Sequence, residues 1–208
     1  MLGNLTPTVR AILIANIIVF GAQTWLGDET LLRFALWPLH SSDPERSLPF
    51  GIWQLVTYAF LHGGFTHLFA NMFALYMFGS DVERLLGSRR FQVFYFVCVI
   101  GAAVAQELVT ATIRPSFEPT VGASGGIFGI LLCFGMAFPR RQLLLLFPPI
   151  PMPAWLFVTL YGILELLLGV FGTNQGVAHF AHLGGMAAGY LLILYWRARA
   201  RAPTRRIS

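Results

Sequence analysis

The sequence has few charged residues and no lysine. Charged side chains make up 11% of the 208 residues, and all fourteen basic residues are arginine. A soluble domain usually carries about 25% charged residues, so this composition argues against a soluble protein. Apolar residues reach 56% and the mean hydropathy is +0.68. Long apolar runs in such a chain are typical of membrane-spanning helices.

The sequence also shows no pattern typical of a disulfide framework, of a signal-peptide cleavage site or of a basic face. Its two cysteines, Cys98 and Cys133, lie in apolar runs, where we expect small buried side chains. The first apolar run, "VRAILIANIIVFGAQTWLG", has no Ala-x-Ala-like cleavage site, which predicts a retained helix. The net charge of +5 comes from arginines that adjoin apolar runs, as in "GSRR" and "FPRR". That pattern is typical of membrane topology and argues against a nucleic-acid partner.

The apolar runs predict an all-α membrane protein with a single domain over residues 1–208. The six expected transmembrane helices span about 8–26, 67–86, 90–113, 124–138, 150–171 and 177–197, followed by a short basic tail at 198–208. With both termini in the cytoplasm, eleven arginines lie inside and only Arg33, Arg46 and Arg114 lie outside. We therefore expect a multi-pass protein of the bacterial cytoplasmic membrane, because the chain adds no organelle-targeting extension to these spans.

The fourth expected span is short. Its fifteen residues, Ser124 to Phe138, would extend roughly 22 Å at 1.5 Å per residue, against a hydrocarbon core of about 30 Å. If Arg140 and Arg141 hold its inner end, Ser124 lies at a recessed, hydrated helix N-terminus. The long outer connection, about 27–66, has broken apolar pieces rich in aromatic residues. We expect it to lie half-sunk in the outer leaflet.

The stretch "GASGGIFG" (122–129) places the hydroxyl of Ser124 among four glycines. A small serine can let two membrane helices approach each other closely. Alternatively, Ser124 is a nucleophile, and neighbours such as Gly122 and Gly125 are small so that a substrate backbone can reach it. The stretch alone leaves both interpretations open.

Polar residues of three expected spans converge at one depth. His67 and Asn71 are four residues apart and share one helix face, and His179 and His182 are three apart in the sixth span. Because spans two, four and six all run inward, these four residues and Ser124 all lie near the outer ends of their helices. Polar groups in a membrane are costly and point to function, and these residue types suit acyl-transfer chemistry.

Three motifs resemble, in order and spacing, the signatures of the rhomboid family of intramembrane serine proteases. They are "HGGFTHLFAN" followed by "ERLLG", then "GASGGIFG", then "AHFAHLGGMAAG". The resemblance covers about residues 50–197 and implies a rhomboid-like six-helix bundle with Ser124 as nucleophile and His182 as its base. Transmembrane proteins would be the substrates, reaching the site between spans two and five, and the loop "GTNQG" (172–176) would cap it.

The resemblance also implies supporting roles. His67, Asn71 and the Ser124 backbone N–H would form the oxyanion hole, and Phe128 would pack on the His182 ring. No aspartate lies near the outer end of span six. We therefore expect a dyad in which packing and neighbours other than a carboxylate hold His182. The remaining residues expected to support the site are His179, His62, Gly122, Gly125, Gly185 and Gly189, the last two bringing span six close to span four.

Other interpretations of the polar residues stay open. A metal site made by the four histidines of the motifs would have neither an HExxH motif nor a helper carboxylate, so no metal or cofactor is expected. Gln106, Glu107 and Glu165 could serve interhelical hydrogen bonds or an ion path. Two rival functions follow, a small transporter and a catalytically silent rhomboid-like binder of membrane clients. In this family an arginine often follows the loop tryptophan, whereas Gln54 follows Trp53 here.

Overall fold

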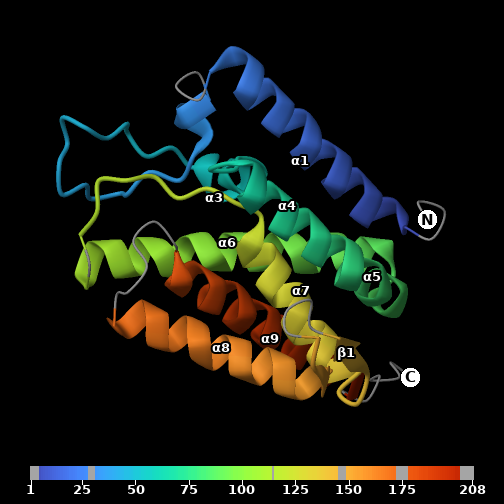
Figure 1. Ribbon diagram of the computed structural model, residues 1–208. Helices are drawn as coiled ribbons and strands as arrows, with labels where there is room; N and C mark the ends of the chain where they lie inside the picture. The colour runs from blue at the N-terminus through green and yellow to red at the C-terminus, as the bar shows by residue number, and fades with distance from the viewer. Residues whose placement is uncertain (1–4, 28–30, 114, 145–148, 172–177, 202–208) are drawn as a thin grey trace, which may run out of the picture.

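The computed structural model describes residues 5–27, 31–113, 115–144, 149–171 and 178–201 (Figure 1). It is a bundle of helices with one small hairpin. The helical elements are α1 (Pro7–Leu26), η2 (Leu32–Phe34), α3 (Gln54–Thr57), η3 (Tyr58–Phe60), α4 (Phe65–Ala74), the π-helical turn η4 (Leu75–Gly79), α5 (Ser80–Leu86), α6 (Ser88–Thr112), α7 (Ser124–Ala137), α8 (Ala154–Phe171) and α9 (His179–Arg201). The strands are β1 (Gln142–Leu144) and β2 (Pro151–Pro153).

Each expected span coincides with a helical segment to within a few residues. Within the described part of the chain, α1, α6 and α8 are long and apolar enough to cross a membrane, and α7 is a shorter apolar helix. The total of six membrane crossings stays a prediction. The same holds for the position of residues 27–66 in the outer leaflet and for the orientation of the termini.

Successive long helices alternate in direction (Figure 1). The η2, α3 and η3 turns lie at one end of the bundle, which we call the loop end, and the β1–β2 hairpin lies at the other. Three segments, α4–α5, α7 and α9, all start toward the loop end. Figure 1 also shows that α7 starts partway along α6 rather than level with its end. The first residue of α7 is therefore set back into the bundle, as the short apolar run predicts.

The hairpin differs from the sequence-based prediction. Strand β1 pairs antiparallel with β2, and the helix predicted from residue 150 begins only at Ala154. The physical reason is local: prolines at 149, 151 and 153 fix φ and remove backbone donors, which favours extended chain. The start of α8 is held instead by the Ala154 N–H, which donates to the Arg141 carbonyl at 2.9 Å.

Glu83 ties the first helix to the bundle. Its carboxylate accepts the Thr8 and Val9 backbone N–H groups at 3.1 and 2.9 Å, which belong to the first turn of α1. The Thr6 and Ser88 hydroxyls also donate to it, at 2.5 and 2.6 Å. Because the first N–H groups of a helix have no partner within the helix, this acid caps α1 from a neighbouring element. Its role in the described chain is structural.

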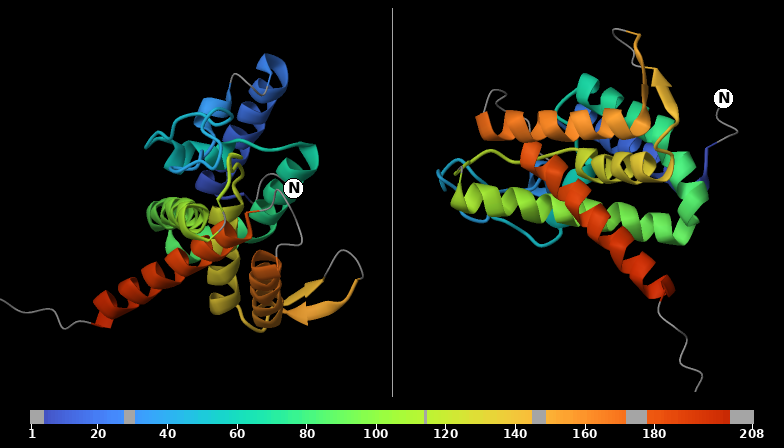
Figure 2. Two further views of the ribbon diagram at one scale, coloured as in Figure 1. Left: turned by 90° about the vertical axis from the view of Figure 1, so that its left-hand side faces the viewer. Right: turned by 90° about the horizontal axis from the view of Figure 1, so that it is seen from below.

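Helices α6, α7 and α9 pack through small residues. A Cβ on Gly185 of α9 would overlap the Gly125 carbonyl oxygen of α7, so the two backbones touch. Gly189 behaves differently from the expectation: a Cβ there would meet Cys98 and Phe94 of α6 rather than α7. The reason is that α9 crosses α6 and passes beside α7 (Figure 2). Glycines one helical turn apart therefore meet different neighbours.

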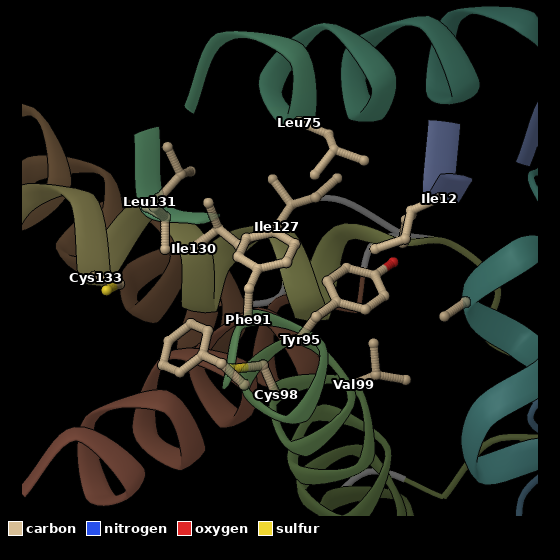
Figure 3. Packing of buried hydrophobic residues seen from close by; sticks show 14 of the residues in the cluster. Ile12, Leu75, Phe91, Tyr95, Cys98, Val99, Ile127, Ile130, Leu131 and Cys133 are labelled. Atoms are coloured by element: carbon tan, nitrogen blue, oxygen red, sulfur yellow. The ribbon is translucent and has the colours of Figure 1, made fainter. Parts of the chain in front are cut away.

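The apolar core surrounds the seam, by which we mean the contact of α6, α7 and α9 through small residues (Figure 3). Aromatic and branched side chains of α6 face the branched side chains of α7, and residues of η4 and α1 close the cluster from the other side. The labelled members are Ile12, Leu75, Phe91, Tyr95, Cys98, Val99, Ile127, Ile130, Leu131 and Cys133. Both cysteines are buried and unpaired, as their apolar surroundings predict. The core thus fixes α7 from two sides.

Gln54 anchors the loop that precedes α3. It is buried, and its Oε1 accepts the Trp37 backbone N–H at 3.1 Å. Its Nε2 donates to the carbonyls of Arg33 and Pro49 at 3.0 and 3.3 Å. The residue that departs from the family pattern therefore performs the anchoring itself. A neutral amide can do this because the three partners are backbone groups of both polarities.

We expect Gln54→Leu to lower the free energy of unfolding by about 1–3 kcal/mol, because buried backbone groups would lose their partners. Thermal unfolding in detergent measures this as a lower Tm. Gln142→Leu is the matched control, since Gln142 is exposed on β1 and its replacement should change the stability by less than about 0.5 kcal/mol. Equal Tm values for the two variants would contradict the anchoring role.

Candidate functional site

A cavity of about 570 Å³ lies where α4, α7, α8 and α9 approach one another. Its wall includes the loop residues 116, 118–122 that lead into α7. The polar and aromatic residues that line it are Tyr58, His67, Asn71, Gln106, Ser116, Glu118, Thr120, Ser124, Phe128, Tyr161 and His182. The sequence-predicted residues of three separate helices therefore meet at one cavity.

Ser124 and His182 are in direct contact. The Ser124 Oγ lies 2.8 Å from His182 Nε2, within the range of a hydrogen bond. Ser124 is the first residue of α7 and His182 lies in the first turn of α9. The contact between Gly185 and Gly125 brings these two helix ends together. The small residues of the seam thus set the distance between the two polar groups.

Glu165 of α8 contacts the other side of the same ring. Its Oε2 lies 2.8 Å from His182 Nδ1 and 2.7 Å from His179 Nδ1. The prediction that no carboxylate would hold His182 is therefore wrong. It considered acids near the outer end of the sixth span alone, whereas this carboxylate comes from the last two turns of the preceding antiparallel helix. An unexplained acid within an apolar span was the available signal.

The hydrogen-bonding pattern defines the role of each nitrogen of His182. With Glu165 ionised, its carboxylate can only accept, and Nδ1 is then the nitrogen that carries the proton in the contact with Glu165. In the neutral ring Nε2 then has a free lone pair. That lone pair faces the Ser124 hydroxyl. The ring is thus oriented to receive the proton of the serine.

Phe128 covers one face of the His182 ring. The two rings stack with centroids 4.2 Å apart and an angle of 7° between their planes. Phe128 also packs against Tyr161 of α8, with centroids 5.0 Å apart. The imidazole is therefore held by a flat contact on its face in addition to hydrogen bonds at both of its nitrogens.

His67 and Asn71 are four residues apart on α4, and both line the cavity. The Gly63 N–H donates to His67 Nδ1 at 3.4 Å, which leaves the ring proton on Nε2. The Asn71 Nδ2 donates to the His67 carbonyl at 3.0 Å, and its second amide hydrogen stays available. Both side chains can therefore offer an N–H to the cavity.

Gly122 keeps His67 close to Ser124. A Cβ on Gly122 would lie 2.7 Å from His67 Nε2 and 3.7 Å from the Ser124 Oγ. The φ angle of Gly122 is +126°, in a region that favours glycine. The glycine before the serine is thus required both by the backbone conformation and by the space that the imidazole occupies.

His62 lies behind His67, outside the expected spans. It is 2% exposed, and its ring meets the His67 ring edge to face with centroids 5.1 Å apart. Burial and the neighbouring His67 lower the pKa of His62 to about 4. The side chain of Gln23 holds the His62 backbone through hydrogen bonds of 3.0 and 3.2 Å. His62 therefore packs as a neutral ring that supports His67.

The remaining predictions for polar residues have mixed outcomes. Glu107 accepts the Leu39 backbone N–H at 2.7 Å, so it connects α6 to the loop between η2 and α3. Glu165, His179 and His182 each present a possible metal ligand atom within 4.8 Å of one another. The sequence argued against a metal on two grounds, the absence of an HExxH motif and the absence of a helper carboxylate, and Glu165 removes the second. The ligand atoms of these three residues already make hydrogen bonds to one another. The expected cap at 172–176 lies outside the described residues.

The chain is similar to known proteins. A family model described as a rhomboid domain matches residues 49–199. The chain is 28% identical over 197 residues to the rhomboid protease GlpG of Serratia proteamaculans, covering 94% of this chain and 64% of that protein. It is 32% identical over 146 residues to the mitochondrial rhomboid protein 1 of Saccharomyces cerevisiae, covering 66% and 40%. It is 31% identical over 141 residues to the putative rhomboid protease YdcA of Bacillus subtilis, covering 67% and 65%. The chain therefore spans between 40% and 65% of the length of these relatives.

Proposed function

The chain is an integral membrane protein that belongs to the rhomboid family, and on this premise we propose that it is an intramembrane serine protease. Ser124 is the nucleophile and His182 is the general base. The observation that carries the proposal is the 2.8 Å contact between Ser124 Oγ and His182 Nε2. A serine hydroxyl is a weak nucleophile until a base within hydrogen-bond reach can take its proton.

The reaction proceeds in two halves. The Ser124 Oγ attacks the scissile carbonyl carbon while its proton moves to His182 Nε2. The tetrahedral intermediate then collapses as His182 returns that proton to the leaving amine, and an acyl-enzyme remains. A water molecule attacks the acyl carbon, gives a proton to His182, and releases the second product as Ser124 recovers its hydrogen.

Three donors support an oxyanion at the intermediate. The backbone N–H of Ser124 lies at the positive end of α7, and His67 Nε2 and the Asn71 amide face the same cavity. Preorganised donors of this kind stabilise the charge that develops in the transition state. This assigns His67 and Asn71 to charge stabilisation and leaves proton transfer to His182.

The cavity suits a transmembrane helix that has unwound locally. The carbonyls of an intact helix are hydrogen-bonded, so small or helix-breaking residues near the cut should favour cleavage. Both α4 and α8 line the cavity, which supports lateral access of substrate between these helices. The arginine distribution predicts that both termini lie in the cytoplasm, and in that orientation the recessed start of α7 supports cleavage within or near the outer leaflet.

Gly122→Ala tests the oxyanion arrangement. The new methyl group would displace His67, and the loss of an oxyanion donor costs about 10²–10³-fold in kcat. We therefore expect a loss of this size with a much smaller change in KM. Gly21→Ala is the control, because a Cβ on Gly21 meets nothing within 4 Å. Unchanged kcat in a folded Gly122→Ala protein would contradict the assignment.

The proposed function is tested by cleavage in liposomes. The purified protein is reconstituted with two single-span substrates. The span of one has a helix-breaking segment with glycine, and the span of the other has no such segment. We expect two products from the substrate with the broken helix and slower cleavage of the other. Absence of cleavage, together with ion or solute flux that survives replacement of Ser124, would support a transporter instead.

A further inference from the structure

We propose that Glu165 is the positioning residue for the base, so that this chain uses a Ser124–His182–Glu165 relay rather than a dyad. The inference rests on the proposed protease function and deepens it. It concerns a carboxylate from α8 that the family motifs on α4, α7 and α9 do not include. Glu165 does not touch the substrate and acts through His182.

The geometry has the order that a relay requires. Glu165 Oε2 lies 2.8 Å from His182 Nδ1, and His182 Nε2 lies 2.8 Å from the Ser124 Oγ. The side chain of Glu165 is 6% exposed and that of His182 is 11% exposed. Shielding from water strengthens a charged hydrogen bond. The carboxylate therefore selects the ring tautomer whose Nε2 lone pair faces the serine.

His179 holds the carboxylate from its other side. Its Nδ1 lies 2.7 Å from the same Oε2, and its side chain is 6% exposed. Glu165 therefore receives two imidazole donors from successive turns of α9. Because one oxygen accepts from both rings, rotation of the carboxylate away from His182 would also break the contact with His179. His179 is thus a second partner of this acid, separate from the contact that the acid makes with His182.

The charge balance of the reaction favours this arrangement. When His182 takes the proton of Ser124, the ring becomes a cation beside the Glu165 carboxylate. The proton stays on Nε2 until it passes to the leaving amine, and Glu165 keeps its negative charge throughout. Glu165 from α8 and His179 from α9 contact the ring, whereas Tyr161 from α8, His67 from α4, Tyr58 and the loop residue Glu118 share its cavity as further ionisable groups. Of the two groups in contact with the ring, Glu165 is the acid.

The alternative is that Glu165 merely ties α8 to α9. In that case its contact with His179 would serve as well as its contact with His182. Glu165→Gln and His179→Phe separate the two roles. The first keeps the size of the side chain and removes its charge, whereas the second removes one tie and leaves the carboxylate on His182.

The experiment measures kcat, KM and Tm for the reconstituted wild type and for both variants. We expect Glu165→Gln to lower kcat by at least about 10²-fold, by analogy with the 10⁴-fold loss when a triad aspartate becomes an amide, with KM changed less than about threefold. His179→Phe should lose much less. Equal losses in kcat and Tm for both variants, or a wild-type activity that a metal chelator abolishes, would overturn the proposal.

A spectroscopic measurement tests the proposal even if a variant has little activity or low stability. Nitrogen-15 spectra of histidine-labelled protein report which ring nitrogen of His182 carries the proton. We expect the Nδ1–H form in the wild type and its loss in Glu165→Gln. Wild type that cleaves substrate while Glu165→Gln keeps both the tautomer and the full rate would overturn this inference alone. Wild type that does not cleave would overturn the proposed function.

Discussion

Ser124→Ala is expected to abolish cleavage, with a loss in kcat of at least about 10³-fold and of up to about 10⁶-fold if the chemical step limits the rate. The alanine cannot attack the carbonyl, and the rest of the cavity keeps its shape. Ser124 is the first residue of α7, and the N-cap position is held by Ala123, so the Tm should change little. Cleavage of a single-span substrate in liposomes gives the measurement.

The control and the double variant make this prediction specific. Ser42→Ala replaces an exposed serine of the loop between η2 and α3 and should keep full activity. His182→Ala should lose nearly as much as Ser124→Ala, and the double variant should lose no more than the worse single one, because the two groups act as one unit. Additive losses, or a Ser124→Ala protein that still cleaves, would contradict a shared role.

Gly185→Ala is expected to lower both activity and stability, and it changes no polar group. The added methyl would overlap the Gly125 carbonyl oxygen, and a helix backbone cannot turn away as a flexible side chain can. Helix α9 would have to move away from α7 and carry His182 from Ser124. A misplacement of about 1 Å can lower the rate about 10²-fold, and overpacking typically costs about 1–3 kcal/mol.

Gly162→Ala is the matched control for this prediction. Gly162 also lies within a long helix, but a Cβ there would meet only the flexible end of Met186, at 3.4 Å. Alanine is favoured over glycine by roughly 0.8–1.0 kcal/mol in a helix interior, so this variant should keep its activity and gain some stability. If Gly185→Ala behaved like Gly162→Ala in kcat and Tm, the close contact of α7 and α9 would not set the site.

The sequence predicted which helices meet at the site because the relevant patterns are local. The four-residue spacing of His67 and Asn71 sets a shared face, and the alternation of helix direction sets a shared depth. The short apolar run after Ser124 predicted the recessed start of α7. Their roles in catalysis stay predictions until the variants are measured.

Other features depend on tertiary packing that one sequence does not reveal. Glu165 could be recognised as an unusual acid in an apolar run, but its contact with His182 depends on how α8 and α9 face each other. Gly189 lies one helical turn from Gly185, yet it meets α6 because α9 crosses the bundle at an angle. The late start of α8 does not depend on tertiary packing. The prolines before Ala154 were a local signal for it, but the prediction gave more weight to the apolar run.

The central claim is that His182 activates Ser124, and the most direct test is reaction with a fluorescent fluorophosphonate. The detergent-purified wild type should gain one adduct, which mass spectrometry should locate on Ser124, and neither Ser124→Ala nor His182→Ala should react at a comparable rate. A wild-type protein that stays unlabelled in several detergents and in liposomes, or that carries the adduct on another residue, would contradict the claim.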